Sequence, residues 1–483
     1  MPSRKRVPAP LAWLLVAVAL LGLAWAFLTP AWQSPDENSH FAYLQSLGER
    51  FDLPGDPERE SYSTEQWQAI QAVNADQVAA VLATDPEWSE QAYERWRKSE
   101  DELSGPKRQD GGGPNPATAN PPLYYLYTSL AYRAAASGDI FDRILAARVA
   151  GLVWPLLVTL GAWLLAGELF GRDRTLQFAA AALGGLMPMT SFISASINPD
   201  GMLYATWTIF LWLGVRALRR GLDVPTAFGL AAVTGIALVV KATSYALLPA
   251  LALVFGVGLW RARRSPPLRI AATVGAAAAA LAATGGIWTL IARGLNRAAS
   301  GQLATPGAGS GLDLVQLASY LWQFYLPRLP WQDPFPNSTG LPAFEIFVKG
   351  AWGAFGWLEV KLAEPVYVAL GALTLATFVA AGVALWRTRR SFDWAVAAFL
   401  ALATATLLAG LHWTEYHFVL SGNPNFMQGR YLLPLVGIGG LALAKALTLV
   451  PPAWRMTAVA GIAGLLVALQ LYGLGLVLQR YYA

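Results

Sequence analysis

The sequence contains no cysteine, only three histidines and few charged residues. Without cysteine the chain can form neither disulfides nor thiolate metal sites, and a cysteine nucleophile is excluded. Charged residues make up 13% of the 483 residues, against about 25% in soluble domains. The chain also carries no P-loop, GxGxxG fingerprint or HExxH motif, so no motif indicates a nucleotide, dinucleotide or zinc-protease site.

Long apolar runs take the place of these features. Runs long enough to cross a bilayer as a helix, which takes about 20 residues, recur along most of the chain. They predict an all-α, polytopic integral membrane protein with about 11 transmembrane helices. The candidate spans are 11–29, 144–170, 175–193, 200–218, 225–240, 243–260, 268–291, 364–386, 393–411, 431–449 and 454–477.

The basic residues fit this class of protein. The net charge is +5, but the basic residues lie in short loops, which is typical of membrane topology and gives no indication of nucleic-acid binding. The basic segment Arg4–Arg6 before the first run resembles the start of a signal peptide. No small-residue cleavage site follows the long run, so we interpret 11–29 as an uncleaved first span.

The orientation depends on one short apolar segment, Leu123–Ala136. If this segment does not cross the membrane, the later arginine clusters share the cytoplasmic side with the N-terminus, as the positive-inside rule favours. These clusters are at 172–174, 216–220, 261–269 and 387–390. We therefore predict an interfacial or re-entrant helix here, with Tyr124, Tyr125 and Tyr127 at the level of the lipid headgroups.

This topology gives one transmembrane domain over 1–483 with a cytoplasmic N-terminus. Three long loops then face away from the cytoplasm, at 30–142, 292–363 and 412–430. The cytoplasmic loops are short, so the functional groups are expected on the outer face.

The two longer outer loops contain further elements. In the first, 64–103 is predicted to be helical, and 105–120, rich in Gly, Pro and Asn, is predicted to be a mobile connection. The second begins with a flexible stretch at 298–311. Its aromatic segments 314–331 and 344–364 are predicted to be helices lying in the interface plane.

An acidic motif, Ser34-Pro35-Asp36-Glu37-Asn38-Ser39-His40, follows the first span. It matches a capping box with Ser34 at the N-cap and Glu37 at N3, and starting a helix could be its whole role. Asp36, Glu37 and His40 would lie on one helical face. Two neighbouring carboxylates raise one pKa of the pair, which suits a general base that accepts a proton from a hydroxyl.

Other polar groups fall on the same predicted side. Asn198-Pro199-Asp200 repeats the arrangement of a cap followed by an acid, and capping alone would explain it. Lys241 is a lone cation in a turn between apolar helices, where snorkelling to the interface is the alternative explanation. Arg430 begins a late span and offers a fork that matches phosphate oxygens. Weaker phosphate candidates near the second span are Arg143 and Arg148.

The sequence leaves metal dependence open. A site built from histidines is weakly supported, because the spacing of the last two matches no strong signature; its members would be His40, His412 and His417. Hard carboxylate ligands suit Mg or Mn better, and the candidates are Asp36, Glu37 and Asp200. No organic cofactor is expected.

Taken in order, these motifs resemble the GT-C superfamily of multi-spanning membrane glycosyltransferases. The acidic motif after the first span and the entry Asn120-Pro121-Pro122-Leu123-Tyr124-Tyr125 carry this resemblance. Within the superfamily the chain resembles a bacterial family of predicted membrane proteins of unknown function. The marks of that family read here Pro35 to His40, Asn198 to Asp200, Lys241, Phe355-Gly356-Trp357-Leu358 and Gly429-Arg430-Tyr431. Relatives often carry two aspartates where this chain has Asp-Glu, so the identity of the base stays open.

The resemblance implies an enzyme of the bacterial cytoplasmic (inner) membrane that works on its outer face, in cell-envelope polysaccharide biosynthesis. The donor would be a sugar linked to polyprenyl phosphate, and the acceptor a hydroxyl of a glycan, lipid or protein, with inversion at the anomeric carbon. The implied catalytic residues are Asp36 and Glu37. The implied donor phosphate ligands are Lys241, Arg430 and Arg148. The residues implied to contact or orient substrate are His40, Asn198, Asp200 and Tyr431.

The donor lipid would lie in a groove between the interfacial segments 314–331 and 344–364. A transporter or flippase of polyprenyl-linked sugars or polysaccharide is the alternative, since it would also need many spans and outer-face charges. Transporters are often built from internal repeats, and no repeat is visible here, which favours the enzyme. A scaffold for polymer assembly that has lost catalysis is a third possibility.

Overall fold

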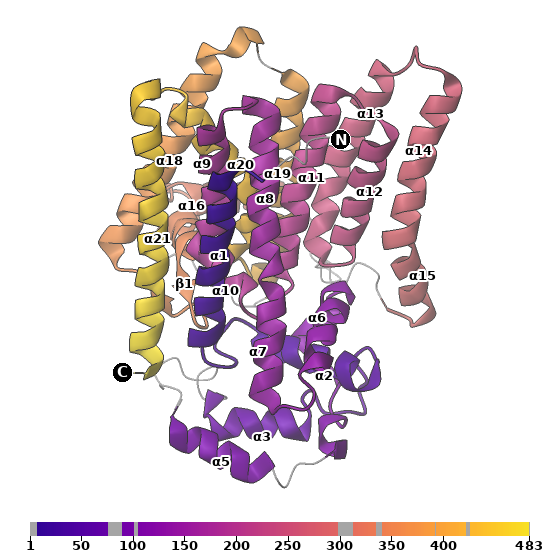
Figure 1. Cartoon of the computed structure of the whole chain (residues 1–483), viewed down its shortest axis with the longest axis vertical. Helices are drawn as coiled ribbons and strands as arrows, with labels where there is room; N and C mark the ends of the chain where they lie inside the picture. The colour runs from indigo at the N-terminus through magenta and orange to yellow at the C-terminus, as the bar shows by residue number, and fades with distance from the viewer. Residues whose placement is uncertain are drawn as a thin grey trace.

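The computed structural model describes residues 7–75, 89–100, 105–297, 313–334, 341–391, 393–421 and 426–482. This part of the chain is helical apart from turns, loops and one hairpin, in which β1 (Ala354–Phe355) pairs antiparallel with β2 (Val360–Lys361). The long helices run along one axis, and α2 (Glu37–Arg50), α3 (Thr64–Ala72), α5 (Glu90–Glu100) and α6 (Leu123–Ala134) gather beneath them (Figure 1). The prediction of an all-α polytopic fold is confirmed.

Nine helices in the described residues are long and apolar enough to cross a membrane. They are α1 (Ala9–Leu28), α7 with α8 (Ile140–Gly151, Val153–Phe170), α11 (Asp200–Arg220), η3 with α13 (Ala242–Leu247, Leu248–Arg261), α14 to α15 (Pro267–Leu281, Ile287–Gly294), α18 (Glu364–Arg387), α19 (Trp394–Leu420), η7 with α20 (Gly429–Leu435, Val436–Leu447) and α21 (Pro452–Tyr482). A tenth span is formed if α9 (Arg174–Leu186) and α10 (Pro188–Ser194) count as one, although they meet at a bend of 50°. Proline, which lacks an N–H, begins α10 and accounts for the break.

The predicted span 225–240 forms α12 (Val224–Leu238), which has 15 residues and is therefore about 22 Å long. It is shorter than the nine candidate spans, so the predicted number of eleven is not confirmed. Helix α12 begins just after the end of α11, where Arg261 donates a hydrogen bond to the carbonyl of Leu218. Lys241 follows the end of α12 and contacts Asp200, the first residue of α11. The short helix therefore returns the chain to the end of the bundle at which α11 begins.

The arginine-rich connections gather at the end of the bundle opposite α2 and α6 (Figure 1). Ion pairs join them there: Arg220 lies 2.7 Å from Glu168, and Arg455 lies 3.1 Å from Asp173. The bundle thus has one basic end, and its other end carries the acidic motif.

Helix α6 is only 12 residues long and is not among the candidate spans. The expected headgroup position of its tyrosines is wrong for Tyr124 and Tyr125, which are completely buried in protein. The Tyr124 hydroxyl accepts a hydrogen bond from the amide of Asn198 (2.8 Å), and the Tyr125 hydroxyl bonds to His40 (2.7 Å). These partners belong to distant segments, so α6 is held against the site.

In the described part of the first loop, the stretch predicted to be a mobile connection is fixed by backbone contacts. Within 64–103 the described helices are α3 and α5, and residues 76–88 and 101–104 lie outside the described part. The 105–120 stretch is pinned by backbone hydrogen bonds, for example from Gly113 to the carbonyl of Glu60 (2.8 Å). A side chain on Gly113 would overlap the carbonyl of Arg59. Close backbone approach therefore explains a glycine that we had interpreted as a sign of mobility.

The second loop corrects two further predictions, while 298–311 lies outside the described residues. The segment 314–331 forms α16 (Leu314–Tyr325), but 344–364 is no interfacial helix. It forms a π-helix (η5, Ala343–Lys349), a short helical turn and then the hairpin, where Leu358 adopts a positive φ of 73°. The Phe324 and Phe347 rings contact each other at 5.1 Å. At this point, side chains close the lipid groove expected between the two segments.

Candidate active site

The acidic motif does not form the predicted capping box. Helix α2 begins at Glu37, and the N-cap residue is Asp36, whose side chain makes no capping hydrogen bond. Asp36 has a left-handed backbone (φ 61°), a conformation that costs on the order of 1 kcal/mol for a residue with a side chain. The turn allows the carboxylates of Asp36 and Glu37 to have different partners.

Glu37 is completely buried and forms a two-bonded ion pair with Arg148, at 2.8 and 2.6 Å. Backbone amides of Trp32 (2.9 Å) and Ile197 (3.1 Å) donate to the same carboxylate. The remaining donors of Arg148 form hydrogen bonds to carbonyls at and just after the end of α1, including that of Pro30 (2.9 Å). Glu37 and Arg148 thus tie α1, α7 and the turn before α11 together. Neither has a donor or acceptor left for the catalytic or phosphate-binding role that the sequence implied.

The predicted phosphate ligand Arg143 also has a structural position. It is completely buried and pairs with Glu65 of α3 at 2.5 Å. Arg108 lies 3.0 Å from the same carboxylate. This ion pair clamps the first loop onto α7. Nothing in the sequence indicated that Glu65, an acid in a polar helix, would be its partner.

Four other predicted residues come together in a chain of alternating charge, which we call the charge cluster: Asp36, Arg430, Asp200 and Lys241. Arg430 Nη2 lies 3.0 Å from Asp36 Oδ2, and its Nε lies 3.8 Å from Asp200 Oδ2. Lys241 Nζ lies 2.5 Å from Asp200 Oδ1. Each residue comes from a different segment, so the cluster is a product of the tertiary fold.

Two members of the charge cluster are open and two are enclosed. The Asp36 side chain is 43% exposed and that of Lys241 22%, whereas Arg430 is 3% and Asp200 1% exposed. In the described structure, Arg430 Nε and Nη1 have no hydrogen-bond partner, and neither has Asp200 Oδ2. A buried donor without a partner is costly. Because Arg430 Nε already faces the Asp200 carboxylate, Nη1 is the donor suited to an anionic ligand.

The charges of the cluster keep Asp36 ionised. Burial alone would raise the pKa of the Asp36 carboxyl, but the positive charges of Arg430 and Lys241 and the Arg430 hydrogen bond outweigh this, and the pKa is lowered. A carboxyl with such a pKa is a carboxylate at neutral pH.

His40 lies beside the charge cluster as a neutral side chain. Burial is the main cause that lowers its pKa to about 4, and the charges of Lys241 and Arg430 add to it, while Asp36 opposes the shift. Its Nδ1 bonds to the hydroxyl of Tyr125 at 2.7 Å. Tyr125 also accepts from Asn120 Nδ2 (3.2 Å). Asn120 and Tyr125 belong to the stretch that carried the family resemblance, but the sequence did not predict this contact.

Asn198 and Tyr431 support the cluster in different ways. The Asn198 side chain accepts a hydrogen bond from the amide of Asp200 (2.9 Å) and donates one to the carbonyl of Pro35 (3.4 Å). It thereby fixes the start of α11 against the acidic motif. The Tyr431 ring faces Lys241 Nζ at 5.2 Å, a distance at which an aromatic face attracts a cation.

The segment Phe355-Gly356-Trp357-Leu358, which forms the turn of the hairpin, contacts the loop just before the acidic motif. Trp357 Nε1 donates to the carbonyl of Trp32 (2.9 Å), four residues before Asp36. Gly356 and Leu358 both have positive φ and shape the turn that presents this ring. The hairpin therefore supports the loop that carries Asp36.

The residues do not fit the metal sites considered from the sequence. Glu37 faces Arg148, and Arg430 lies between the carboxylates of Asp36 and Asp200. Both ring nitrogens of His412 bond to tyrosines, Tyr320 and Tyr325, at 2.9 and 2.7 Å. Across the described ranges, no three His, Asp or Glu side chains form a group that could hold a metal ion.

The sequence matches a known family over residues 19–438, described as predicted membrane protein, DUF2142. The chain belongs to the DUF2142 family. The resemblance to a family of predicted membrane proteins is thus confirmed. Comparison with curated proteins finds no match.

The fold of this DUF2142 protein is similar to those of larger membrane proteins. The archaeal oligosaccharyltransferase AglB from Archaeoglobus fulgidus, in complex with an inhibitory peptide and a dolichol-phosphate, gives a TM-score of 0.50 at 12% identity, covering 98% of this chain and 56% of AglB. ArnT from Cupriavidus metallidurans, bound to undecaprenyl phosphate, gives 0.47 at 14% identity, covering 98% of this chain and 76% of ArnT. The Archaeoglobus fulgidus oligosaccharyltransferase in complex with Zn and sulfate gives 0.47 at 12% identity, covering 97% and 53%.

The DUF2142 chain thus spans little more than half the length of the archaeal oligosaccharyltransferases. At these identities the likeness shows the fold alone. That fold is a GT-C-like transmembrane bundle, as the sequence predicted.

Proposed function

We propose that this DUF2142 protein is an inverting glycosyltransferase that moves a sugar from a polyprenyl-phosphate donor to an acceptor hydroxyl. The observation that carries the proposal is the pairing of an open carboxylate, Asp36, with a buried guanidinium, Arg430, whose Nη1 has no hydrogen-bond partner in the described structure. A base and an anion-binding group in contact are what a sugar phosphate donor and a hydroxyl acceptor require.

The donor phosphate binds Arg430 and Lys241 in this proposal. A guanidinium N–H forms a strong, charge-assisted hydrogen bond to a phosphate oxygen, and Arg430 Nη1 is a donor without a partner in the described structure. Asp200 holds Lys241 from the buried side at 2.5 Å. The exposed part of Lys241 provides a second positive charge toward the same anion.

The reaction is a single displacement. The acceptor oxygen attacks the anomeric carbon, its proton passes to Asp36, and the bond from the anomeric carbon to the phosphate oxygen breaks with its electron pair on the phosphate. Arg430 and Lys241 stabilise the negative charge of the departing polyprenyl phosphate, which is electrostatic stabilisation of developing charge. One displacement inverts the anomeric centre.

Donor binding also adjusts the base. In the free protein Arg430 lowers the pKa of Asp36, which keeps the carboxylate ionised but makes it a weak proton acceptor. A phosphate on Arg430 places negative charge near Asp36 and raises its pKa. Asp36 therefore becomes a stronger base once the donor is bound.

Neutral His40, Asn198 and Tyr431 position these groups, and we assign no proton transfer to them. Arg430 and Lys241 supply the positive charge that a divalent ion would otherwise bring. We propose that the reaction needs neither Mg nor Mn.

We further propose that the charge cluster faces the outside of the bacterial cytoplasmic membrane and acts in cell-envelope glycan synthesis. The separation of the arginine-rich end from the acidic end supports this orientation, since cytoplasmic loops carry the excess of Lys and Arg. The acceptor is a glycan, lipid or protein of the envelope.

The test uses the full chain in detergent with a set of radiolabelled polyprenyl-phosphate sugars and a membrane-extract acceptor. We expect sugar transfer without a sealed membrane, and loss of about 100-fold or more in Asp36→Asn, the usual effect of losing a general base. Asp52→Asn, at a carboxylate that is 57% exposed, is the matched control and keeps full activity. Sugar movement that requires sealed vesicles would point instead to a transporter.

A further inference from the structure

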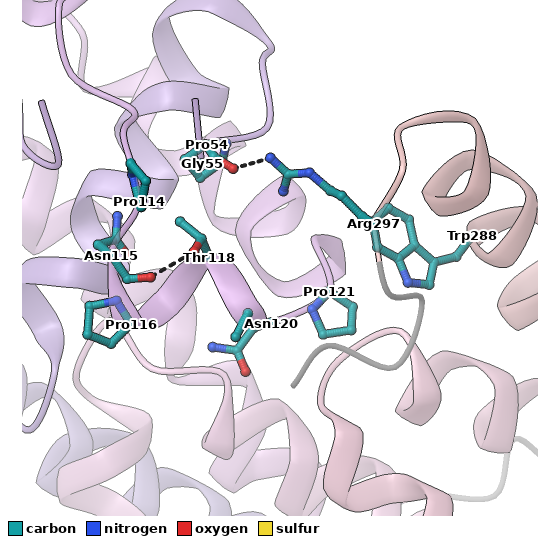
Figure 2. Close-up of a pocket in the computed structure, with 11 residues that line it drawn as sticks. Pro54, Gly55, Pro114, Asn115, Pro116, Thr118, Asn120, Pro121, Trp288 and Arg297 are labelled. Atoms are coloured by element: carbon teal, nitrogen blue, oxygen red, sulfur yellow. Dashed lines mark hydrogen bonds between the residues drawn. The ribbon is translucent and has the colours of Figure 1, made fainter. Parts of the chain in front are cut away.

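A pocket between the first loop and helix α15 is not used in the proposed reaction. It has a volume of about 510 Å³, within the range of small-molecule sites, about 300–1,000 Å³. Its walls are the turn Pro54–Gly55, residues of the stretch 114–121, Trp288 of α15 and Arg297, which follows that helix (Figure 2).

The lining favours a hydroxyl-rich ligand, and its charged member, Arg297, donates to the carbonyls of Leu53 and Pro54. Four prolines and Trp288 provide flat apolar faces, and Asn115, Thr118 and Asn120 provide short polar groups between them. The described lining residues include no carboxylate. Asn115 Nδ2 is buried and has no hydrogen-bond partner in the described structure. A sugar ring has the matching surface, with C–H groups on its faces and hydroxyls at its edge.

The wall formed by Trp288 and Arg297 is anchored to both neighbours. Arg297 Nη2 donates to the carbonyls of Leu53 (3.3 Å) and Pro54, as Figure 2 shows for the turn at Pro54 and Gly55. Trp288 is buried against Val239, two residues before Lys241. Trp288 therefore packs on the segment that leads to Lys241.

The pocket is joined to the charge cluster by hydrogen bonds. Asn120, which lines the pocket, donates to the Tyr125 hydroxyl (3.2 Å), and this hydroxyl bonds to His40 (2.7 Å). His40 lies one helical turn after Asp36, and its amide donates to the Asp36 carbonyl (3.0 Å). A ligand in the pocket is thus connected to the region of the proposed base through Asn120, Tyr125 and His40.

We propose that this pocket binds the acceptor as a neutral glycan, with a sugar ring against Trp288 and the prolines and a hydroxyl held by Asn115. This inference rests on the proposed glycosyltransferase function. An extended peptide fits the lining less well, because prolines offer no N–H to its carbonyls and Arg297 already donates to backbone carbonyls.

The test measures binding by saturation-transfer NMR, using the full chain in detergent without donor and neutral trisaccharides of glucose, mannose or galactose. We expect saturable binding of at least one trisaccharide. Ala119→Trp fills the pocket and weakens this binding at least tenfold. Ala136→Trp, at an exposed position after α6, is the matched control and leaves binding unchanged.

Asn115→Asp keeps the test informative if Ala119→Trp does not fold. The new carboxylate retains an oxygen for the amide of Ala117, which Asn115 Oδ1 now caps at 2.9 Å, but it loses the Nδ2 donor. We expect at least tenfold weaker binding. The proposal is overturned if no trisaccharide binds, if neither variant weakens binding, or if a proline-rich peptide displaces the sugar and binds more tightly.

A parallel measurement of undecaprenyl-phosphate binding separates the two proposals. Trisaccharide binding without any binding of the lipid phosphate would remove the proposed function and leave the glycan pocket. Binding and slow hydrolysis of a lipid-phosphate sugar, with no trisaccharide binding, would remove the pocket assignment alone.

Discussion

Arg430 Nη2 lies 3.0 Å from Asp36 Oδ2, although the two residues are 394 positions apart in the chain. The guanidinium is almost completely enclosed, and the carboxylate is open. Because Arg430 also approaches Asp200, it links an exposed acid to a buried one. This geometry leads to predictions that separate chemical roles from structural ones.

Arg430→Lys should keep the charge but lose the fork of donors. A hydrogen bond to a charged group contributes about 1.5–3 kcal/mol, so we expect the donor KM to rise about tenfold to a hundredfold, with a smaller fall in kcat. Steady-state kinetics with a lipid-phosphate sugar measures both values. Arg133→Lys, at an exposed arginine on α6, is the control. An unchanged donor KM in Arg430→Lys would exclude phosphate binding by this residue.

Glu37→Gln should lower the stability of the protein, and we expect no direct effect on the proposed reaction step. Breaking a buried ion pair costs about 3–5 kcal/mol because the remaining charge, here that of Arg148, is left unpaired. We expect a large fall in melting temperature in detergent, partly restored by the additional change Arg148→Met. Glu90→Gln, at an exposed position, is the control. A folded, fully stable and inactive Glu37→Gln would instead support a catalytic role for Glu37.

His40 should make stability depend on pH. Its pKa is about 4 in the folded protein, lowered from 6.5 mainly by burial, so between these values the unfolded chain binds more protons than the folded one. Stability is fully present above pH 6.5 and falls toward pH 4, by about 3 kcal/mol at 1.36 kcal/mol per unit. Melting curves from pH 4 to 8 measure this, and His40→Gln should flatten the dependence. An identical slope in His40→Gln would assign the effect to other groups.

The lowered pKa of Asp36 predicts that activity falls only at a pH below the usual pKa range of a carboxyl group. Its pKa in the free protein is lowered by Arg430 and Lys241 against the effect of burial, and a base works only when ionised. The plot of kcat/KM against pH reports ionisations of the free enzyme. It should therefore stay level as the pH falls to the usual pKa of an aspartate. A loss of activity centred near neutral pH would indicate another base.

Removal of divalent cations should leave transfer intact, because Arg430 and Lys241 already surround the position proposed for the phosphate. Assays with EDTA, compared with added Mg or Mn, test this. Activity that disappears with EDTA and returns with Mn would contradict the proposed cation-free mechanism.

The sequence predicted which residues share one end of the bundle, because arginine clusters and apolar run lengths report topology directly. It did not predict that Asp36 pairs with Arg430 while Glu37 pairs with Arg148. That division depends on Arg148, which reaches Glu37 across 111 positions, and on a left-handed residue at Asp36 that no local pattern required. The tyrosines of α6 were misplaced for a similar reason, since composition cannot distinguish a lipid headgroup from a buried polar partner.

The hairpin contact from Trp357 to the carbonyl of Trp32 joins segments 325 positions apart, and Arg430 comes later still. During synthesis, the loop with Asp36 leaves the ribosome long before its support and its counter-ion exist. The site can form only after the segment that begins α20 has been inserted. A truncated or stalled chain would therefore present Asp36 without its counter-ion Arg430, and under the proposed mechanism it would lack the group that binds the donor phosphate.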